Sequence, residues 1–201
     1  MLASKVQEKA IIPSWDNTHF DRVRPIGIRR FRADDSGAMW SAVRESVREL
    51  CEWMVWCKAD YSFEDSSAFV SRCAAEWKEN KSYSFVIFDR EDDSFLGSIA
   101  LNGINHTHKL ANVGYWIRTE KTRRGVASAA IGLIARFAFN HTELQRMEIV
   151  VPLGNRASIR AAEKAGTTRE GLLRSRVMLD GTARDAIMYS IVKEDFVISR
   201  T

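Results

Sequence analysis

The chain has 201 residues, a length typical of one domain or of two small ones. Its residues are 45% hydrophobic and 28% charged, an ordinary globular balance that excludes a disordered or collagen-like chain. There are 30 Lys and Arg against 26 Asp and Glu. Because the basic residues are scattered, this charge favours an anionic partner without indicating direct nucleic-acid binding.

Cysteine usage and the N-terminal sequence indicate a cytoplasmic protein. Cys51, Cys57 and Cys73 are odd in number and have no C-x-x-C spacing, so neither paired disulfides nor a zinc site is expected. The charged N-terminus, whose apolar run stops at Pro13, does not resemble a signal peptide, and no apolar stretch is long enough to span a membrane. We therefore expect no metal and no membrane partner.

The first predicted elements are a strand and two amphipathic helices. Residues 1–23 lack clear periodicity and are expected to form an extension, and a strand is predicted over 26–31. Oxygen-bearing side chains at 34–36 can cap a helix whose apolar residues recur at spacings of three and four as far as Met54. Ser62 begins a capping-box-like pattern for the second helix.

Changes of hydrophobic period divide the rest of the chain into six strands and two helices. In chain order we predict strands over 83–88, 95–101 and 112–118, a helix over 126–139, a strand over 148–153, a helix over 156–165, and strands over 169–179 and 183–192. Asp180-Gly181, between the last two strands, is a strong hairpin signal. This order predicts an α/β fold (α+β mixed sheet) with helices on both faces of a central mixed sheet, in a single domain over 24–201.

A basic turn between a strand end and a long apolar helix is a candidate anion site. The turn holds Arg123, Arg124 and Gly125, and the helix begins with Val126, Ala127 and Ser128. Free N–H groups at a helix N-terminus, together with the helix dipole, bind anions, and Gly125 lets the backbone approach a phosphate closely. A diphosphate would fit; the alternative is a capped helix with a solvated basic turn. The sequence contains neither a Walker P-loop nor a G-x-G-x-x-G fingerprint.

A second candidate site follows the next strand, at Asn155 and Ser158. The Asn155 amide can both donate to and accept from the amides of a ligand, and Ser158 lies about one helical turn later. The alternative is that Asn155 is a helix N-cap and Ser158 a first-turn residue. The residues alone leave both interpretations open.

Taken together, these motifs resemble the GNAT N-acetyltransferases. The residues that carry the resemblance are G-Y-W-I at 114–117, R-G-x-A at 124–127, N-x-x-S at 155–158, E-K-A-G at 163–166 and E-G at 170–171. They are most similar to the ribosomal-protein N-acetyltransferase branch, the RimJ/RimL-like proteins, as is the hairpin at 180–185 with Tyr189 and Ser190. The resemblance covers roughly residues 24 to 196.

The resemblance implies a GNAT acyl-CoA N-acyltransferase fold with acetyl-coenzyme A as donor and no metal. In that fold two neighbouring parallel strands separate, here those ending near Ile117 and Leu153, and the pantetheine arm lies between them. The residues it assigns to the coenzyme are Ile117, Arg118 and Thr119 through their backbone, Arg123, Arg124, Gly125, Val126, Ala127 and Ser128 at the pyrophosphate, Asn155 at the pantetheine amides, Ser158 near the sulfur and Lys164 near the nucleotide.

Acetyl transfer to an amine needs a neutral amine, a stabilised oxyanion and a proton for the departing thiolate. The resemblance places the backbone N–H of Ile117 near the thioester oxygen and makes Ser158 the candidate proton donor, directly or through water. Relatives commonly carry a glutamate base two residues before the G-Y-W segment, where this chain has Asn112, which takes up no proton. The base is therefore another residue or water.

Two pairs of residues have both a functional and a structural interpretation. His106 and His108 have the right chemistry for a base, and the alternative is that they are solvated loop histidines. Trp53 and Trp56, at the end of the first long helix, either line the acceptor groove or pack in the core.

The resemblance therefore predicts an N-acetyltransferase that acts on a primary amine, with a protein or peptide N-terminal amine as the expected acceptor. Direct attack in a ternary complex is expected because no cysteine lies in a donor-site motif. The alternatives are a small-molecule amine acetyltransferase, an acyl-CoA-binding regulatory module without catalysis, and a nucleic-acid- or ribosome-binding protein. Residues 50–66 and 102–111 are expected to determine the acceptor, and the protein is expected to be a monomer or homodimer.

Overall fold

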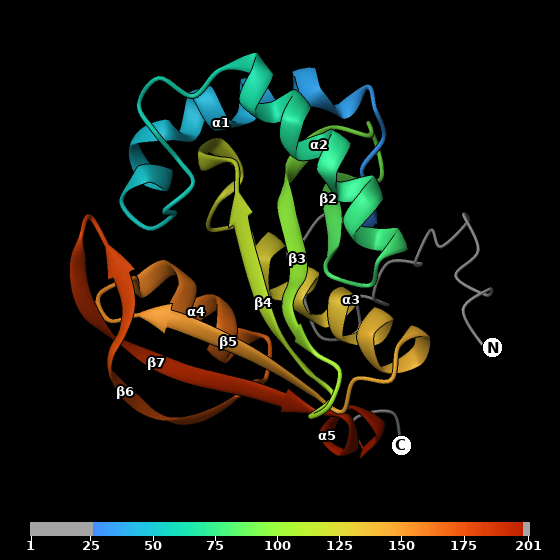
Figure 1. Cartoon of the computed structure of the whole chain (residues 1–201), viewed down its shortest axis with the longest axis vertical. Coiled ribbons are helices and arrows are strands. Elements are labelled where there is room, and N and C mark those ends of the chain that lie inside the picture. Colours follow the sequence, from blue (N-terminus) through green and yellow to red (C-terminus); the bar gives the residue numbers. More distant parts are fainter. Residues whose placement is uncertain (1–25, 199–201) are drawn as a thin grey trace.

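A mixed sheet with helices on both faces forms the described part of the chain, residues 26–198, in the computed structural model (Figure 1). The fold class predicted from the element order is confirmed, and the predicted extension, residues 1–23, lies outside the described residues. The elements are β1 (Ile26–Arg30), α1 (Asp35–Cys51), α2 (Phe63–Lys78), β2 (Tyr83–Asp89), β3 (Phe95–Asn105), β4 (Leu110–Ile117), η2 (Thr119–Lys121), α3 (Val126–His141), β5 (Arg146–Pro152), α4 (Arg156–Lys164), β6 (Thr168–Leu179), β7 (Thr182–Val192) and α5 (Lys193–Ile198).

The strands lie in the order β1-β2-β3-β4-β5-β7-β6. Among these described strands, β4 and β5 form the one parallel pair, and every other neighbouring pair is antiparallel. The predicted hairpin is present: Asp180 and Gly181, with φ of 47° and 71°, turn the chain from β6 into β7. Two consecutive residues with positive φ match the turn that the right-handed twist of paired strands requires.

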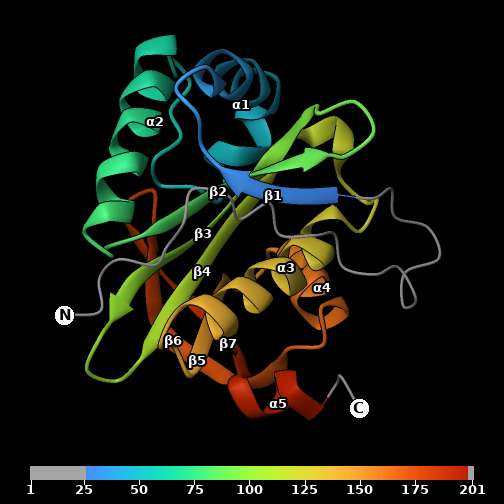
Figure 2. The ribbon, with the colours of Figure 1, turned by 90° about the vertical axis from the view of Figure 1, so that its right-hand side faces the viewer.

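Helices α1 and α2 cover one face of the sheet through a small apolar core. Its buried helical residues are Met39, Ala42, Val43 and Leu50 on α1 and Val70 on α2. They pack against Val86, Phe95 and Trp116 from β2, β3 and β4. Figure 2 shows both helices on the opposite side of the sheet from α3 and α4.

Helix α3 is buried on most sides, as its predominantly apolar sequence predicts. Its Phe137 ring lies 4.9 to 5.5 Å, between centroids, from the rings of Trp77, Tyr83 and Phe85. Trp77 Nε1 also donates to the Ser84 carbonyl oxygen at 3.2 Å, which fixes the end of α2 to β2. No helix between residues 26 and 198 is long and apolar enough to cross a membrane.

Several element boundaries differ from the sequence prediction. Helix α1 ends at Cys51 although the apolar spacing continues to Met54, because Met54 packs onto the α1–α2 core from the turn that follows. Strands β3 and β4 extend further toward their connecting turn than predicted, so the loop is residues 106–109. Helix α5 was not predicted, since six residues are too few to show a helical period.

The aromatic cluster around Phe137 predicts a large stability effect. We expect Phe137→Ala to lower the free energy of unfolding by about 3–5 kcal/mol, because it removes a fully buried ring and leaves a cavity. Phe63→Ala is the matched control, since the Phe63 side chain is 46% exposed, and it should cost far less. Urea unfolding of both variants measures this. Equal losses would contradict the placement of Phe137 at the centre of the core.

Candidate active site

Strands β4 and β5 are paired over only three residues and then part. The paired residues are Leu110 to Asn112 on β4 and Arg146 to Glu148 on β5. Beyond them β4 stays paired with β3 as far as Ile117, and β5 stays paired with β7 as far as Pro152. Each strand thus follows its antiparallel neighbour, and the two diverge (Figure 1). We call residues 113–117 and 149–152 the β4–β5 fork; it lies where two strands were predicted to separate.

Backbone groups on one side of β4 face the fork. Arg118 N–H donates to the Leu96 carbonyl oxygen on β3 at 2.8 Å. Because antiparallel partners alternate along a strand, the Trp116 N–H also points to β3, whereas those of Tyr115 and Ile117 point toward the fork. The Ile117 N–H, expected to stabilise an oxyanion, therefore faces the fork.

The other two backbone positions predicted to bind the coenzyme are already engaged through their N–H groups. Arg118 N–H is bonded to β3, and its guanidinium forms an ion pair with Glu45 on α1. Thr119 N–H donates to Ser46 Oγ on α1 at 2.9 Å, and Thr119 Oγ1 donates to Glu49 at 3.2 Å. These bonds attach the end of β4 to α1. The carbonyl oxygens of Arg118 and Thr119 also accept hydrogen bonds within the chain, from Lys121 N–H at 2.9 Å and Thr122 N–H at 3.2 Å, so the backbone of these two residues is already engaged.

The N-terminus of α3 has no side-chain cap. Gly125 is its N-cap residue, with φ of 77°, and Arg123 also adopts a positive φ, of 61°. The Ser128 hydroxyl donates to the Gly125 carbonyl oxygen at 2.9 Å, so it does not cap the helix. By contrast, α2 and α4 are capped by Ser62 and Asn155. The first N–H groups of α3, on Val126, Ala127 and Ser128, are thus the groups that an anion at this turn would meet.

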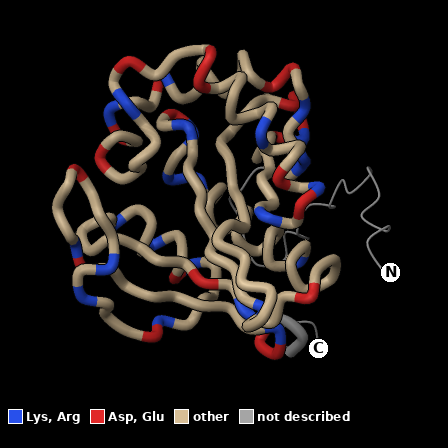
Figure 3. The backbone as a smooth tube through the Cα atoms, viewed as in Figure 1, with Lys and Arg blue, Asp and Glu red and all other residues tan. Residues whose placement is uncertain are grey.

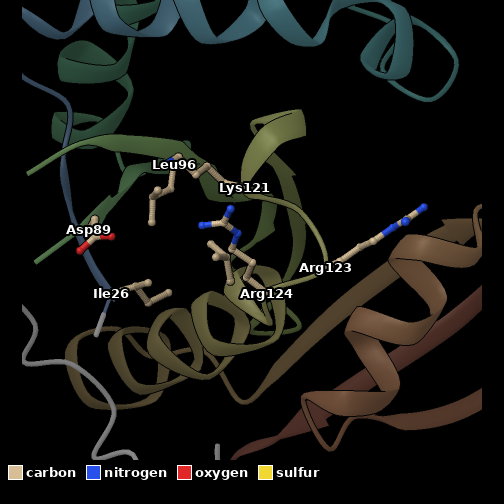
Figure 4. A pocket seen from close by; sticks show the side chains of 7 residues that line it. Ile26, Asp89, Leu96, Lys121, Arg123 and Arg124 are labelled. Atoms are coloured by element: carbon tan, nitrogen blue, oxygen red, sulfur yellow. The ribbon is translucent and has the colours of Figure 1, made fainter. Parts of the chain in front are cut away.

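A hollow of about 320 Å³ lies beside this turn, on the side of β1–β3 rather than in the fork. Its lining residues are Ile26, Asp89, Leu96, Lys121, Arg123, Arg124 and Val126. In Figure 4 the Arg124 side chain points into the hollow, whereas Arg123 points away from it, toward α4. The turn therefore carries positive charge on both of its sides.

Asn155 acts as the N-cap of α4. Its Oδ1 accepts a hydrogen bond from Ser158 N–H at 3.0 Å, as the capping interpretation of the sequence required. The cap fixes the amide at the open end of the fork, directly after β5. Lys164, assigned by resemblance to the nucleotide, is exposed in the last turn of α4, at the far end of that helix from Asn155.

A hydroxyl pair connects the β4 arm of the fork to α4, and the sequence did not indicate it. Tyr115 Oη on β4 lies 2.8 Å from Ser158 Oγ on α4 and donates to the Ser158 carbonyl oxygen at 3.2 Å. Burial raises the pKa of Tyr115 to about 12. Tyr115 is therefore a neutral hydrogen-bond donor at physiological pH, held against the side chain that was predicted to donate a proton.

The remaining candidates from the sequence are dispersed. His106 and His108 are exposed in the β3–β4 turn, at the paired end of β4 and away from the fork, as solvated loop histidines would be. Asn112 Nδ2 donates to Asn102 Oδ1 at 2.9 Å. Between residues 26 and 198 no group of three or more His, Cys, Asp or Glu is placed to hold a metal ion.

The two tryptophans lie in the turn after α1 and contact different parts of the site. Trp53 approaches Gly154, the residue before the α4 cap, so closely that a Cβ at Gly154 would lie 3.6 Å from its ring. The Trp56 ring centroid is 6.1 Å from that of Trp116 on β4, and Trp56 is 41% exposed. The α1–α2 connection therefore reaches the β4 arm of the fork and the turn that follows β5.

Comparison with known proteins matches the chain to acetyltransferases. The family model described as "Acetyltransferase (GNAT) domain" matches residues 26–168. YdaF of Bacillus subtilis is 31% identical over 176 residues, which cover 85% of this chain and 93% of YdaF. The ribosomal-protein-serine acetyltransferase of Escherichia coli is 26% identical over 135 residues, which cover 67% of this chain and 74% of that protein.

A solved structure has the same fold. RimL, a ribosomal alpha-N-protein acetyltransferase in complex with coenzyme A, superposes with a TM-score of 0.78, covering 85% of this chain and 95% of that chain at 20% identity. At this identity the likeness concerns the fold alone.

An ion-pair network beside the paired end of the fork predicts a pH dependence. Arg146 binds both carboxylate oxygens of Glu170, and Ser190 Oγ donates to Glu170 at 2.7 Å. These bonds, Arg146 first, lower the pKa of Glu170 from 4.5 to about 2. A carboxylate with a lowered folded-state pKa stabilises the fold fully above its unfolded pKa and loses that effect as the pH falls toward the folded value.

We therefore expect Glu170→Gln to have a lower urea midpoint than the parent at neutral pH, and the difference should shrink as the pH falls from about 4.5 to about 2. Glu143→Gln is the control, since the Glu143 side chain is 88% exposed and lies outside the helices, and it should change the curve far less. A difference between Glu170→Gln and the parent that stays constant across this pH range would contradict the network.

Proposed function

The chain belongs to the GNAT acetyltransferase family and is an N-acetyltransferase, and from this premise we propose that it transfers the acetyl group of acetyl-coenzyme A to a primary amine at a protein or peptide N-terminus. The observation that carries the proposal is the β4–β5 fork with the uncapped N-terminus of α3 beside it. The fork offers backbone N–H and C=O groups to an extended chain, and α3 offers N–H groups to an anion.

The chemistry of these groups fits acetyl-coenzyme A. Its pantetheine arm contains amides, which can bond the fork-facing backbone of β4 in place of a strand, with Asn155 on the other side. Its pyrophosphate matches the N–H groups of Val126, Ala127 and Ser128 and the charges of Arg123 and Arg124. In this arrangement Lys164 would lie toward the nucleotide. The coenzyme supplies a thioester, whose carbonyl carbon accepts the amine.

The residues of the chain would then lower the barrier in two ways. The Ile117 N–H, which faces the fork, would donate to the thioester oxygen as negative charge grows there. Ser158 Oγ would give a proton to the departing sulfur. The neutral Tyr115 hydroxyl, 2.8 Å away, would then turn its single O–H from the Ser158 carbonyl oxygen to Ser158 Oγ. Direct attack in a ternary complex requires no nucleophile from the protein.

The acceptor side is proposed to be formed by residues 50–66, with Trp53 and Trp56 as its walls. Residues 102–111, also expected from the sequence to determine the acceptor, lie at the paired end of β4, away from the fork. Trp53 lies against the residue before the α4 cap, and Trp56 lies beside Trp116. The names of the E. coli relative and of RimL, a serine and an alpha-N-protein acetyltransferase of the ribosome, support a protein N-terminus over a free small amine.

A coenzyme-A-binding regulatory module is the second candidate, and Asn112 is the observation that favours it, since it takes the place of an expected base. A nucleic-acid-binding protein is less well supported. Figure 3 shows Lys and Arg interspersed with Asp and Glu along α1, α2 and the β6–β7 hairpin rather than gathered into one basic face.

Coenzyme binding is tested with Gly125→Glu. We expect the parent to bind acetyl-coenzyme A and this variant to bind at least about a hundredfold more weakly, because it adds bulk and negative charge at an α3 N-terminus meant for pyrophosphate. The control is Gly37→Glu, which adds the same side chain at an exposed position of α1 with open space around it. Isothermal titration measures both, with thermal unfolding as a check on folding. Unchanged affinity in a folded Gly125→Glu protein would refute this site.

Turnover is tested by thiol release on hexapeptides beginning with Ser, Ala, Thr or Met, and on spermidine. We expect acetylation of at least one peptide, and a reduction of kcat by about ten- to a hundredfold in Ser158→Ala and less in Tyr115→Phe, with coenzyme affinity preserved. A loss of affinity without a loss of kcat would make Ser158 a binding residue. Coenzyme binding with no turnover on any amine would favour the regulatory module.

A further inference from the structure

Asn112 and Glu148 lie side by side where β4 and β5 part. They are the last parallel register partners before the fork, and the side chains of such partners point to the same face of a sheet. Their neighbours Ala111, Met147 and Ile149 are buried in the core beneath α3. Asn112 and Glu148 therefore point to the opposite face, on which α1 and α2 lie.

Within this pair, only Glu148 can take up a proton. Asn112 is an amide whose Nδ2 is bonded to Asn102. The Glu148 side chain is 20% exposed, and its Oε1 accepts from Arg146 Nε at 2.8 Å. Because no other side-chain hydrogen bond to Glu148 occurs in the described part of the chain, Oε2 can accept a proton from a ligand or from water.

The surroundings of Glu148 leave it a net negative site. In the part of the chain that the structure describes, Glu148 forms an ion pair with Arg146 on its own strand, and Arg146 in turn pairs with Glu170 on β6. Its neighbours on the adjoining strands, Asn112 on β4 and Ser190 on β7, are uncharged. Two carboxylates share one guanidinium, so a residual negative charge remains to attract an ammonium group.

We propose that Glu148 is the proton acceptor for the substrate amine, replacing a carboxylate at position 112 from the adjacent strand. The inference rests on the proposed function and goes beyond it by naming the base. Glu148 acts through a chain of ordered water molecules, because the fork-facing Ile117 N–H, the proposed oxyanion donor, lies five residues, about 17 Å, further along β4 than Asn112.

One N–H bond of the acceptor ammonium breaks, and its proton passes through water to Glu148 Oε2 and then to solvent. The freed nitrogen lone pair forms a bond to the thioester carbon, and the C–S bond breaks on collapse of the adduct. The second proton of the nitrogen ends on the departing sulfur, with Ser158 Oγ as the carrier.

The pH dependence of kcat/KM distinguishes this role from a structural one. An N-terminal amine has a pKa of about 8 and is mostly protonated at neutral pH. With Glu148 as acceptor the ammonium form is productive, so the parent should show a nearly flat kcat/KM between about pH 6 and 8. In Glu148→Gln, which keeps an oxygen for Arg146, only the neutral amine reacts, so kcat/KM should rise about tenfold per pH unit over this range.

Moving the carboxylate back to β4 is the second variant. The double variant Glu148→Gln with Asn112→Glu should recover the flat profile, because the two positions share a face and a register. Glu143→Gln is the control, since the Glu143 side chain is 88% exposed and should leave the profile unchanged. Thermal unfolding verifies that each variant is folded. The substrate is the peptide acetylated fastest by the parent.

A binding measurement gives a readout that does not depend on turnover. In the presence of coenzyme A at about pH 6.5, the same peptide should bind Glu148→Gln more weakly than the parent, because its charged amine loses the carboxylate. The N-acetylated peptide, which carries no ammonium group, should bind both proteins equally.

The outcomes separate the two proposals. A parent that acetylates no amine refutes the proposed function and, with it, any base. A parent that is active while Glu148→Gln loses activity by the same factor at every pH, or keeps the parent profile, overturns the role of Glu148 alone. A sloping profile that the double variant flattens supports it.

Discussion

The structure depends on the fact that β4 and β5 stop pairing after three residues. Two parallel strands that part leave a row of N–H and C=O groups without partners, which is costly when those groups are buried. The fork persists because each strand is paired on its other side, β4 with β3 as far as Ile117 and β5 with β7 as far as Pro152. The end of β4 is further attached to α1 through Arg118 and Thr119. The fold thereby presents unpaired backbone that a ligand with amide groups can satisfy, and this is the physical basis of the proposed coenzyme site.

The two faces of the fork have different chemistry. On the α3 and α4 side, Tyr115 and Ser158 form a neutral hydroxyl pair, and burial keeps Tyr115 protonated far above physiological pH. On the α1 and α2 side lie the tryptophans after α1 and the carboxylate of Glu148. Proton donation to a leaving sulfur and proton removal from an amine are opposite tasks, and a parallel pair of diverging strands can hold groups for both because alternate residues point to opposite faces.

The sequence was sufficient for the strands and the long helices, but not for the short helix α5 or for the contacts between elements. Periodicity predicted the strands and helices, and Asp180-Gly181 predicted the β6–β7 hairpin, because these signals are local. The separation of β4 and β5 came only from the family resemblance, since hydrophobic period carries no information about where pairing stops. The Tyr115–Ser158 bond joins residues 43 positions apart. The proposed role of Glu148 as proton acceptor follows only from its register with Asn112. Both needed the tertiary structure, as did the end of α1, where tertiary packing of Met54 replaced one more helical turn.

The register of β4 and β5 also bears on how this chain can catalyse acetyl transfer without a carboxylate at position 112. Without a structure, an asparagine in the expected position of a base favours a protein that has lost catalysis. Neighbouring parallel strands, however, are separated by only about 4.8 Å, and register partners share a face, so water near one partner is also near the other. A carboxylate on β5 can therefore accept a proton at nearly the same place as a carboxylate at its register partner on β4. Glu148 is in that position, and its Arg146 partner is held by Glu170, which keeps the guanidinium from neutralising Glu148 fully. Asn112 is thus weak evidence against catalysis, because the sheet supplies the missing charge from the adjacent strand.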